Sequence, residues 1–314
     1  MTSFIKSLIK SLSATDLVVI FFYLFLISVN IIFFEKIEYW YVLILLDVLL
    51  ILIVFFFANK SNTSKSKIWK NIHFYYVVPL IFLSFKEVYI LLNSIHSQDY
   101  DYLLIAADRF ILGLDPTVFL FQIANPVLTE ILQIAYGTFF FLPIILGIEF
   151  QLKNKSIEFN YIIFTIVYGF FLSYIGYFFL PAVGPRFTLH NFEMTNVELP
   201  GLFLTNFLRE IVNSGESIPS GTLNPVLHVQ RDVFPSGHTQ MTLLVMYLAV
   251  KLKSKNKLFF LIDGSLLIFA TVYLRYHYVI DLIGGMVFMI FTIITGKYLF
   301  NWWQNKSGNE LIKY

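Results

Sequence analysis

Eight long apolar segments, separated by polar stretches, run along the chain. They cover residues 17–34, 39–58, 72–95, 127–148, 159–180, 236–252, 258–274 and 278–300. Each has 17 to 24 residues, which as an α-helix is about the length that crosses roughly 30 Å of hydrocarbon, the shortest only barely. The pattern predicts an all-α polytopic membrane helical bundle of about eight transmembrane helices.

Two stretches do not fit as membrane spans. Residues 98–122 carry several Asp residues among apolar ones, which predicts an interfacial helix at the membrane surface. Residues 181–235 form a long outward loop with several Gly and Pro and one short amphipathic piece at 202–212. Connections of this length are usually functional. No internal repeat or linker divides the chain, so we expect one helical bundle.

The composition agrees with a membrane protein. Hydrophobic residues make up 58% and charged residues 13%, against about 45–50% and about 25% in soluble domains. These values exclude a soluble globular enzyme and a nucleic-acid binder. Cysteine is absent, which excludes disulfides and thiolate chemistry. The first apolar segment has no small-residue cleavage site after it, so we interpret it as a retained membrane helix and not a signal peptide.

The basic residues predict the orientation. With eight spans and a cytoplasmic N-terminus, 15 Lys fall in inner segments, six basic residues fall in outer segments, and Lys86 lies inside a span. The positive-inside rule therefore favours both termini in the cytoplasm. The loop 181–235 and the turn around Arg275 then share the outer face, which is periplasmic, extracellular or lumenal.

The first chemical motif is Pro235-Ser236-Gly237-His238, where the sixth span begins. Ser is a favoured N-cap, and Gly allows backbone amides to approach a ligand closely. A helix N-terminus with free N–H groups binds anions, phosphate among them. The same residues also fit an ordinary capped membrane helix.

The second motif is His277 with Asp281, four residues apart and therefore on one helix face. An Asp within reach of an imidazole fixes its tautomer and leaves the other nitrogen as a nucleophile or base. Helix capping alone would also explain Asp281. A metal site is disfavoured because no third ligand stands nearby in the sequence.

The third motif is Gly184-Pro185-Arg186, just after the fifth span. Arginine binds phosphate through two parallel hydrogen bonds and keeps its charge at all relevant pH values. An arginine at this depth is also a common headgroup-level anchor. The chain has only five arginines, which favours the functional interpretation.

Together, the three motifs resemble the type 2 phosphatidic acid phosphatase superfamily over about residues 70–290. The resemblance implies a six-helix phosphatase-type core and a phosphohistidine mechanism. It makes His277 the nucleophile, His238 the general acid and Asp281 the residue that orients His277. It also implies that Arg186, Ser236 and Gly237 hold the phosphoryl oxygens, and that no metal or cofactor is required.

Two departures from the usual motifs resemble the inositol phosphorylceramide synthase (inositolphosphotransferase) branch. Phe179 and Phe187 stand where the family has Lys and Pro, and Thr271 stands where it has Arg. Arg275 lies two residues before His277 and is assigned to phosphate binding by this resemblance. The implied domains are N-terminal transmembrane helices at 1–70, a catalytic membrane domain at 71–300 and a cytoplasmic tail at 301–314.

Three functions follow as hypotheses. The first is a metal-independent lipid phosphatase or phosphotransferase that acts on a phospholipid or lipid phosphate in the bilayer. We prefer a transferase that resembles inositol phosphorylceramide synthase. The alternative is a simple phosphatase of the phosphatidic acid or isoprenyl diphosphate type. The second is a transporter, which would need inverted repeats and broken helices that the sequence does not show. The third is a vanadate-dependent haloperoxidase, which eight membrane spans argue against.

Overall fold

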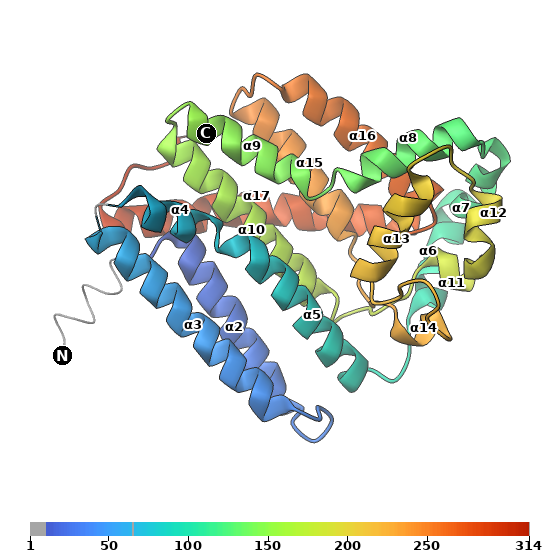
Figure 1. The fold of residues 1–314 in the computed structure, drawn as a ribbon, viewed down its shortest axis with the longest axis horizontal. Helices are drawn as coiled ribbons and strands as arrows, with labels where there is room; N and C mark the ends of the chain where they lie inside the picture. The colour runs from blue at the N-terminus through green and yellow to red at the C-terminus, as the bar shows by residue number, and fades with distance from the viewer. Residues whose placement is uncertain (1–10, 65, 314) are drawn as a thin grey trace. The chain divides into compact units, whose positions relative to one another are not determined.

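The computed structural model describes residues 11–64 and 66–313, and Figure 1 shows their arrangement as helices. No strand occurs in this part of the chain. The predicted all-α class is therefore confirmed. The protein is a multi-pass membrane protein by the length and composition of its helices.

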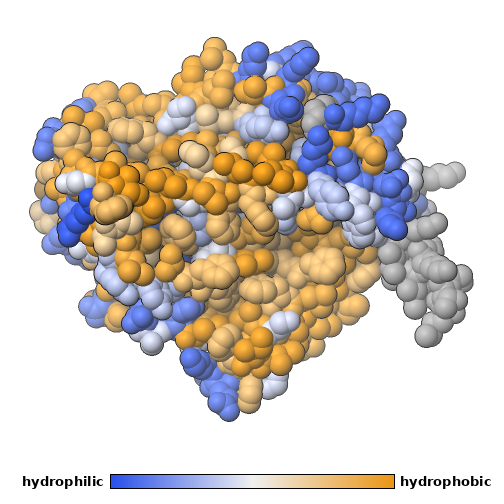
Figure 2. Space-filling view, turned by 180° about the vertical axis from the view of Figure 1, so that it is seen from behind, coloured by the Kyte–Doolittle hydropathy of each residue, from blue (hydrophilic) through white to orange (hydrophobic). Residues whose placement is uncertain are grey.

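Among the described residues, five helical segments are long and apolar enough to cross a membrane: α2 (Ala14–Ile32), α3 (Trp40–Thr63), α4 with α5 (Lys67–Ile95), α10 (Ser156–Gly176) and α17 (Val279–Ser307). They expose many large apolar side chains, and hydrophobic residues cover much of the face in Figure 2. A sixth span is possible if α8 (Pro126–Gly137) and α9 (Phe141–Leu152), which bend by 52° at a short break, count as one. The sequence analysis did not anticipate this break.

The expected count of about eight spans is not confirmed. The sixth and seventh predicted segments form α15 (Gly237–Lys251) and α16 (Lys257–Tyr273), with 15 and 17 residues. At 1.5 Å per residue these helices are about 22 and 26 Å long, short of a hydrocarbon core of about 30 Å. The predicted segments, 17 residues each, are already at the lower limit for a membrane span, and α15 is two residues shorter than its segment.

The chain forms two compact units. Unit 1 contains the described residues up to Ser97, Lys153–Phe171 and the described residues from Phe291 onward. Within it, polar side chains pair between α2 and α5: the hydroxyls of Tyr23 and Ser84 are 3.0 Å apart, and Asn30 donates to Glu87 at 3.3 Å. Such polar contacts hold apolar helices together in lipid.

Unit 2 contains Gln98–Leu152 and Leu172–Ile290, and with them all three motifs. The segment expected to be interfacial forms α6 (Asp101–Leu112), which ends at the left-handed Gly113, followed by the short α7 (Pro116–Leu120) and the 3-10 turn η1 (Phe121–Ile123). Its position at the membrane surface stays a prediction. The long connection contains α11 (Pro185–Thr188), the 3-10 turn η2 (Phe192–Met194), α12 (Thr195–Glu198), α13 (Thr205–Gly215) and α14 (Pro225–His228).

Two glycines on α17 bring its backbone against the start of α15. A Cβ added at Gly285 would lie 2.6 Å from the carbonyl oxygen of Ser236 and 3.2 Å from the nitrogen of Gln240. A Cβ at Gly284 would lie 2.8 Å from the ring of Phe234. The two helices that carry the histidine motifs therefore meet backbone to backbone.

Gly285→Ala should destabilise the protein, because the added methyl meets backbone that cannot rotate away. Overpacking of this kind costs about 1–3 kcal/mol, so we expect the apparent melting temperature in detergent to fall by about 2–6 °C. Gly215→Ala, where a Cβ meets nothing within 4 Å, is the matched control. Equal melting curves for the two variants would contradict the close contact.

Candidate active site

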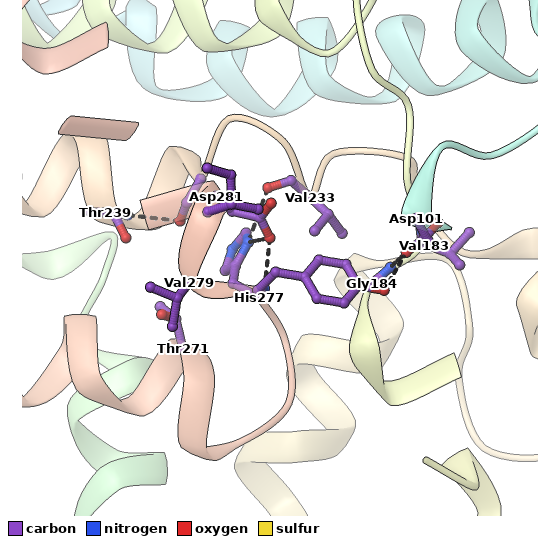
Figure 3. A network of polar contacts seen from close by, with 12 residues as sticks. Asp101, Val183, Gly184, Val233, Thr239, Thr271, His277, Val279 and Asp281 are labelled. Carbon is purple, nitrogen blue, oxygen red and sulfur yellow. Dashed lines mark hydrogen bonds and ion pairs between the residues drawn. The ribbon is translucent and has the colours of Figure 1, made fainter. Parts of the chain in front are cut away.

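His277 lies in the turn between α16 and α17 and is 4% exposed. Its Nδ1 is 3.0 Å from the carbonyl oxygen of Val233 (Figure 3), and its backbone N–H donates to the carbonyl of Thr271 at 3.0 Å. A carbonyl oxygen only accepts hydrogen bonds, so Nδ1 carries the proton. In the neutral ring, Nε2 then holds the free lone pair.

Asp281, in the first turn of α17, is fully buried beside His277, as expected from the sequence. Its Oδ2 is 3.4 Å from His277 Nδ1 and accepts a hydrogen bond from the backbone N–H of Tyr278 at 2.7 Å (Figure 3). Its backbone carbonyl accepts from the N–H of Ser236 at 3.0 Å. The nearest partner of His277 Nδ1 is therefore the Val233 carbonyl, and the Asp281 carboxylate is slightly farther away.

His238, in the first turn of α15, comes close to His277. The centroids of the two imidazole rings are 5.7 Å apart and their planes are inclined by 60°. Residues 39 positions apart thus meet at one point, because α15 and α16 lead away from it and back. The structure brings together the two histidines that the sequence singled out.

Ser236 and Gly237 hold the start of α15. The hydroxyl of Ser236 caps the helix by accepting from the backbone N–H of Thr239 at 3.1 Å (Figure 3), and the side chain is fully buried. A Cβ added at Gly237 would lie 2.6 Å from the Tyr177 hydroxyl. The N-cap expected at Ser236 is present, and a role of both residues in phosphate binding stays a prediction.

Arg186 is held on the loop that leaves α10. Gly184 before it has φ 93°, and a Cβ there would lie 2.9 Å from the carbonyl oxygen of Tyr276, so glycine is required. The guanidinium reaches Asn213 only at 3.4 Å and Glu216 only at 3.8 Å. Both contacts are longer than the roughly 2.7–2.9 Å of strong charge-assisted hydrogen bonds, so an anion would displace them readily.

The side chain of Arg275 contacts α12 and the turn η1. Its guanidinium forms an ion pair with Glu198 of α12 and lies 5.1 Å from the ring centroid of Phe121. Its carbonyl accepts a hydrogen bond from the backbone N–H of Arg186 at 3.1 Å. Phosphate binding by Arg275, expected from its place in the motif, stays a prediction, and the observed contact of Arg275 with Arg186 is through the backbone.

Two aspartates on α6, which the sequence analysis did not select, connect the motifs. Asp101 accepts from the backbone N–H groups of Val183 and Gly184 at 3.0 and 2.8 Å (Figure 3), and from the Tyr278 hydroxyl at 2.8 Å. Asp108 accepts from the N–H groups of residues 279 and 280 at 2.9 and 2.7 Å. Burial raises the pKa of both carboxyls above its ordinary value, and these hydrogen bonds offset only part of that increase.

These two carboxylates tie the arginine loop and the N-terminus of α17 to one helix. Asp101 and Asp108 are seven residues apart, which places them on the same face of α6. The signal in the sequence was two carboxylates at that spacing in a mostly apolar helix.

A column of stacked planar groups crosses the site. The His238 ring stacks on Tyr136, with centroids 4.6 Å apart, and contacts Phe139, with centroids 4.2 Å apart and planes tilted by 38°. Tyr136 stacks on Tyr276 at 4.4 Å, and the Arg186 guanidinium lies 5.0 Å from the Tyr276 centroid. The break between α8 and α9 places Tyr136 and Phe139 around the histidine. One continuous stack therefore joins His238 to Arg186.

The electrostatic setting favours a neutral His277. Burial lowers the pKa of His277 to about 4, and the positive charge of Arg186 acts in the same direction. The charge of Asp232 and the hydrogen bond to Val233 raise it, but by less. A neutral imidazole with Nδ1 protonated can attack an electrophile through Nε2.

Comparison with known families matches residues 103–295 to the PAP2 superfamily. The match covers more than half of the chain and includes every motif residue discussed above. The chain belongs to the PAP2 superfamily, and this membership supports a lipid phosphatase-type function. No curated protein and no solved structure matches the chain. The resemblance is thus confirmed for the superfamily, and the inositol phosphorylceramide synthase branch stays a prediction.

Replacing Tyr136 should misplace His238. Tyr136→Leu removes two ring contacts, each worth about 0.5–1.5 kcal/mol, so we expect kcat for a lipid phosphate to fall about tenfold or more with a smaller change in KM. Tyr136→Phe keeps the stack and should stay within about twofold of the wild type. Equal kcat values and equal pH profiles for the Leu and Phe variants would show that the column does not position the histidine.

Proposed function

We propose that the protein transfers a phosphoryl group from a membrane lipid through a phosphohistidine on His277. The observation that carries this proposal is the meeting of His277, His238 and the loosely held Arg186 in one small, buried region. Membership of the PAP2 superfamily supports the lipid phosphatase-type chemistry. The assignment of individual roles rests on the sequence motifs and on the contacts described above.

In the first step, the lone pair of His277 Nε2 attacks the phosphorus of the lipid. The bond between phosphorus and the leaving oxygen breaks, and His238 gives its proton to that oxygen, so that a neutral alcohol departs. Arg186 balances the negative charge that the equatorial oxygens carry in the transition state. The Val233 carbonyl and Asp281 stabilise the positive charge that develops on His277.

In the second step, His238 acts as the base. It takes a proton from an incoming hydroxyl, whose oxygen attacks the phosphorus and breaks the bond to Nε2. With water the product is a free phosphate or phosphorylated headgroup, and the protein is a phosphatase. With a lipid hydroxyl it is a phosphotransferase, which we prefer because of the motif resemblance to inositol phosphorylceramide synthases.

The distribution of lysines supports an arrangement with both termini cytoplasmic and the site on the outer face. Under this arrangement α15 and α16 would complete eight crossings. We also retain the division into N-terminal helices at 1–70, a catalytic membrane domain at 71–300 and a tail at 301–314.

His277→Ala should abolish turnover, because no other described group is placed to form the covalent intermediate. His238→Ala should let the phosphoenzyme form slowly and persist, because protonation and the second step both lack their catalyst. The measurement is a brief incubation with ³²P-labelled phosphatidic acid, followed by denaturation and acid or alkali treatment. Alkali-stable, acid-labile label on the wild type and on His238→Ala, absent from His277→Ala, is expected. Wild-type turnover by the His277 variant would refute the mechanism.

The product distinguishes the two reaction types. Purified protein would be supplied with phosphatidic acid or phosphatidylinositol, with and without ceramide or diacylglycerol, and the lipids analysed by mass spectrometry. We expect a new inositol-phosphate lipid only when donor and acceptor are both present, and only with intact His277. Inorganic phosphate from phosphatidic acid without any acceptor product would instead identify a phosphatase.

The lowered pKa of His277 sets the expected pH dependence. Because the folded-state value is about 4, below the ordinary value of about 6.5, the nucleophile stays neutral as the pH falls from 7 to about 5 and is lost only as the pH falls through about 4. With phosphatidylinositol, a diester without an ionisation in this range, kcat should hold within about twofold down to pH 5.5. A tenfold loss between pH 7 and 5.5 would contradict this assignment.

A further inference from the structure

Helix α13, in the long connection, exposes a stripe of large apolar side chains and buries two of its polar ones. Thr205 and Arg209 are buried, 1% and 5% exposed. Phe207 and Ile211, one turn apart, are 63% and 53% exposed, and Phe203 just before the helix is 87% exposed. In water this arrangement would expose a stripe of large apolar side chains and bury an arginine.

Hydrogen bonds fix the orientation of α13 about its axis. The carboxylate of Glu130 on α8 accepts from the N–H groups of Leu202, Leu204 and Thr205 at 2.8, 2.6 and 3.2 Å, and from the Thr205 hydroxyl at 2.6 Å. Arg209 donates to the carbonyl of Leu199 at 3.0 Å. These bonds give acceptors to the backbone N–H groups at the start of α13, which have no partner within the helix. A rotation of α13 that turned Phe207 and Ile211 inward would break them.

The helix to which α13 is bound is itself apolar on its exposed side. α8 is half of the bent candidate span. It exposes Val127, Ile131 and Ile134 by 55%, 47% and 41%. Figure 1 shows α13 beside α8, and a Cβ added at Gly137 would lie 3.7 Å from Leu208 of α13. The exposed stripe of α13 is thus attached to a helix whose own exposed side is apolar.

We propose that the apolar stripe formed by Phe203, Phe207 and Ile211 lies among the acyl chains of the leaflet on the side of the active site. The occupant is bilayer lipid, because the stripe adjoins a helix whose exposed side is apolar, carries no charge and is held outward by buried polar bonds. A large apolar side chain gains free energy when acyl chains replace water around it.

The position of α13 also gives the site a direction of approach. Asn213, at the C-terminal end of α13, is the residue whose side chain lies 3.4 Å from the Arg186 guanidinium. In the proposed arrangement, a lipid at the C-terminal end of α13 places its headgroup toward the arginine that we propose binds phosphate. This part of the inference rests on the proposed function, and it makes the membrane leaflet the source of the substrate.

The absence of cysteine from the sequence allows a direct test of the lipid contact. Phe207→Cys, spin-labelled and reconstituted in phosphatidylcholine vesicles, should be more accessible to oxygen than to the water-soluble relaxant nickel ethylenediaminediacetate. Asn206→Cys on the neighbouring polar side of the helix is the control and should show the opposite preference. This measurement requires no turnover, so it is independent of the proposed reaction.

Two results would overturn the proposal. A label at Phe207 that is more accessible to nickel than to oxygen would place the stripe in water. A label shielded from both reagents and immobilised would show that protein covers it, whether a second copy of the chain or another partner.

A kinetic measurement tests the approach of substrate separately. Phe203→Ser with Phe207→Ser should raise KM for a long-chain lipid phosphate in vesicles at least fivefold and leave kcat/KM for a short-chain, water-soluble analogue within about twofold. Phe203→Leu with Phe207→Leu, which stays apolar, should behave as the wild type. Equal losses for both substrates in the Ser variant would show a general structural defect and contradict the inference.

Discussion

Two buried carboxylates on α6 hold the site together. Asp101 and Asp108 accept four backbone N–H groups, two from the loop that carries Arg186 and two from the N-terminus of the helix that carries Asp281. Burying a carboxylate is costly unless it is hydrogen-bonded, and each aspartate has partners at 2.7–3.0 Å. If either carboxylate were lost, two backbone N–H groups would lose their acceptor. The positions of both motifs therefore depend on one short helix.

The two histidines are held in different ways, and the difference suits their proposed tasks. His277 has Nδ1 committed to a carbonyl oxygen, which fixes the tautomer and keeps one nitrogen for bond formation. His238 is held against aromatic rings, which fixes the ring plane without occupying its nitrogens. A group that alternates between acid and base benefits from this arrangement, since neither protonation state loses its support.

Much of the site could be predicted because its signals are local. The spacing of His277 and Asp281 on one helix face, the N-cap at Ser236 and the glycine before Arg186 are all properties of short segments. The Val233 carbonyl could not be predicted, because every residue carries such an oxygen and only the fold selects one. The partner of Arg275, Glu198, is 77 residues away, which no local pattern indicates.

The fold, like the site, could be predicted only where its signals are local. The apolar segments predicted the all-α class and the long helices, but the count of about eight spans is not confirmed. The helix ends depend on contacts that apolar content does not describe. The bend after Gly137 places Tyr136 and Phe139 against His238, and the start of α13 is held by Glu130 on another helix. Both features require tertiary contacts between segments distant in the chain.

The backbone contact between α15 and α17 at Gly285 makes the geometry of the site independent of the side chains on the surface. Because the two backbones touch there, the spacing of the helix starts that carry His238 and Asp281 is set by main-chain atoms. Side chains elsewhere on the two helices take no part in that contact. Substitution of the side chains that α17 exposes therefore leaves the arrangement of the reacting groups unchanged.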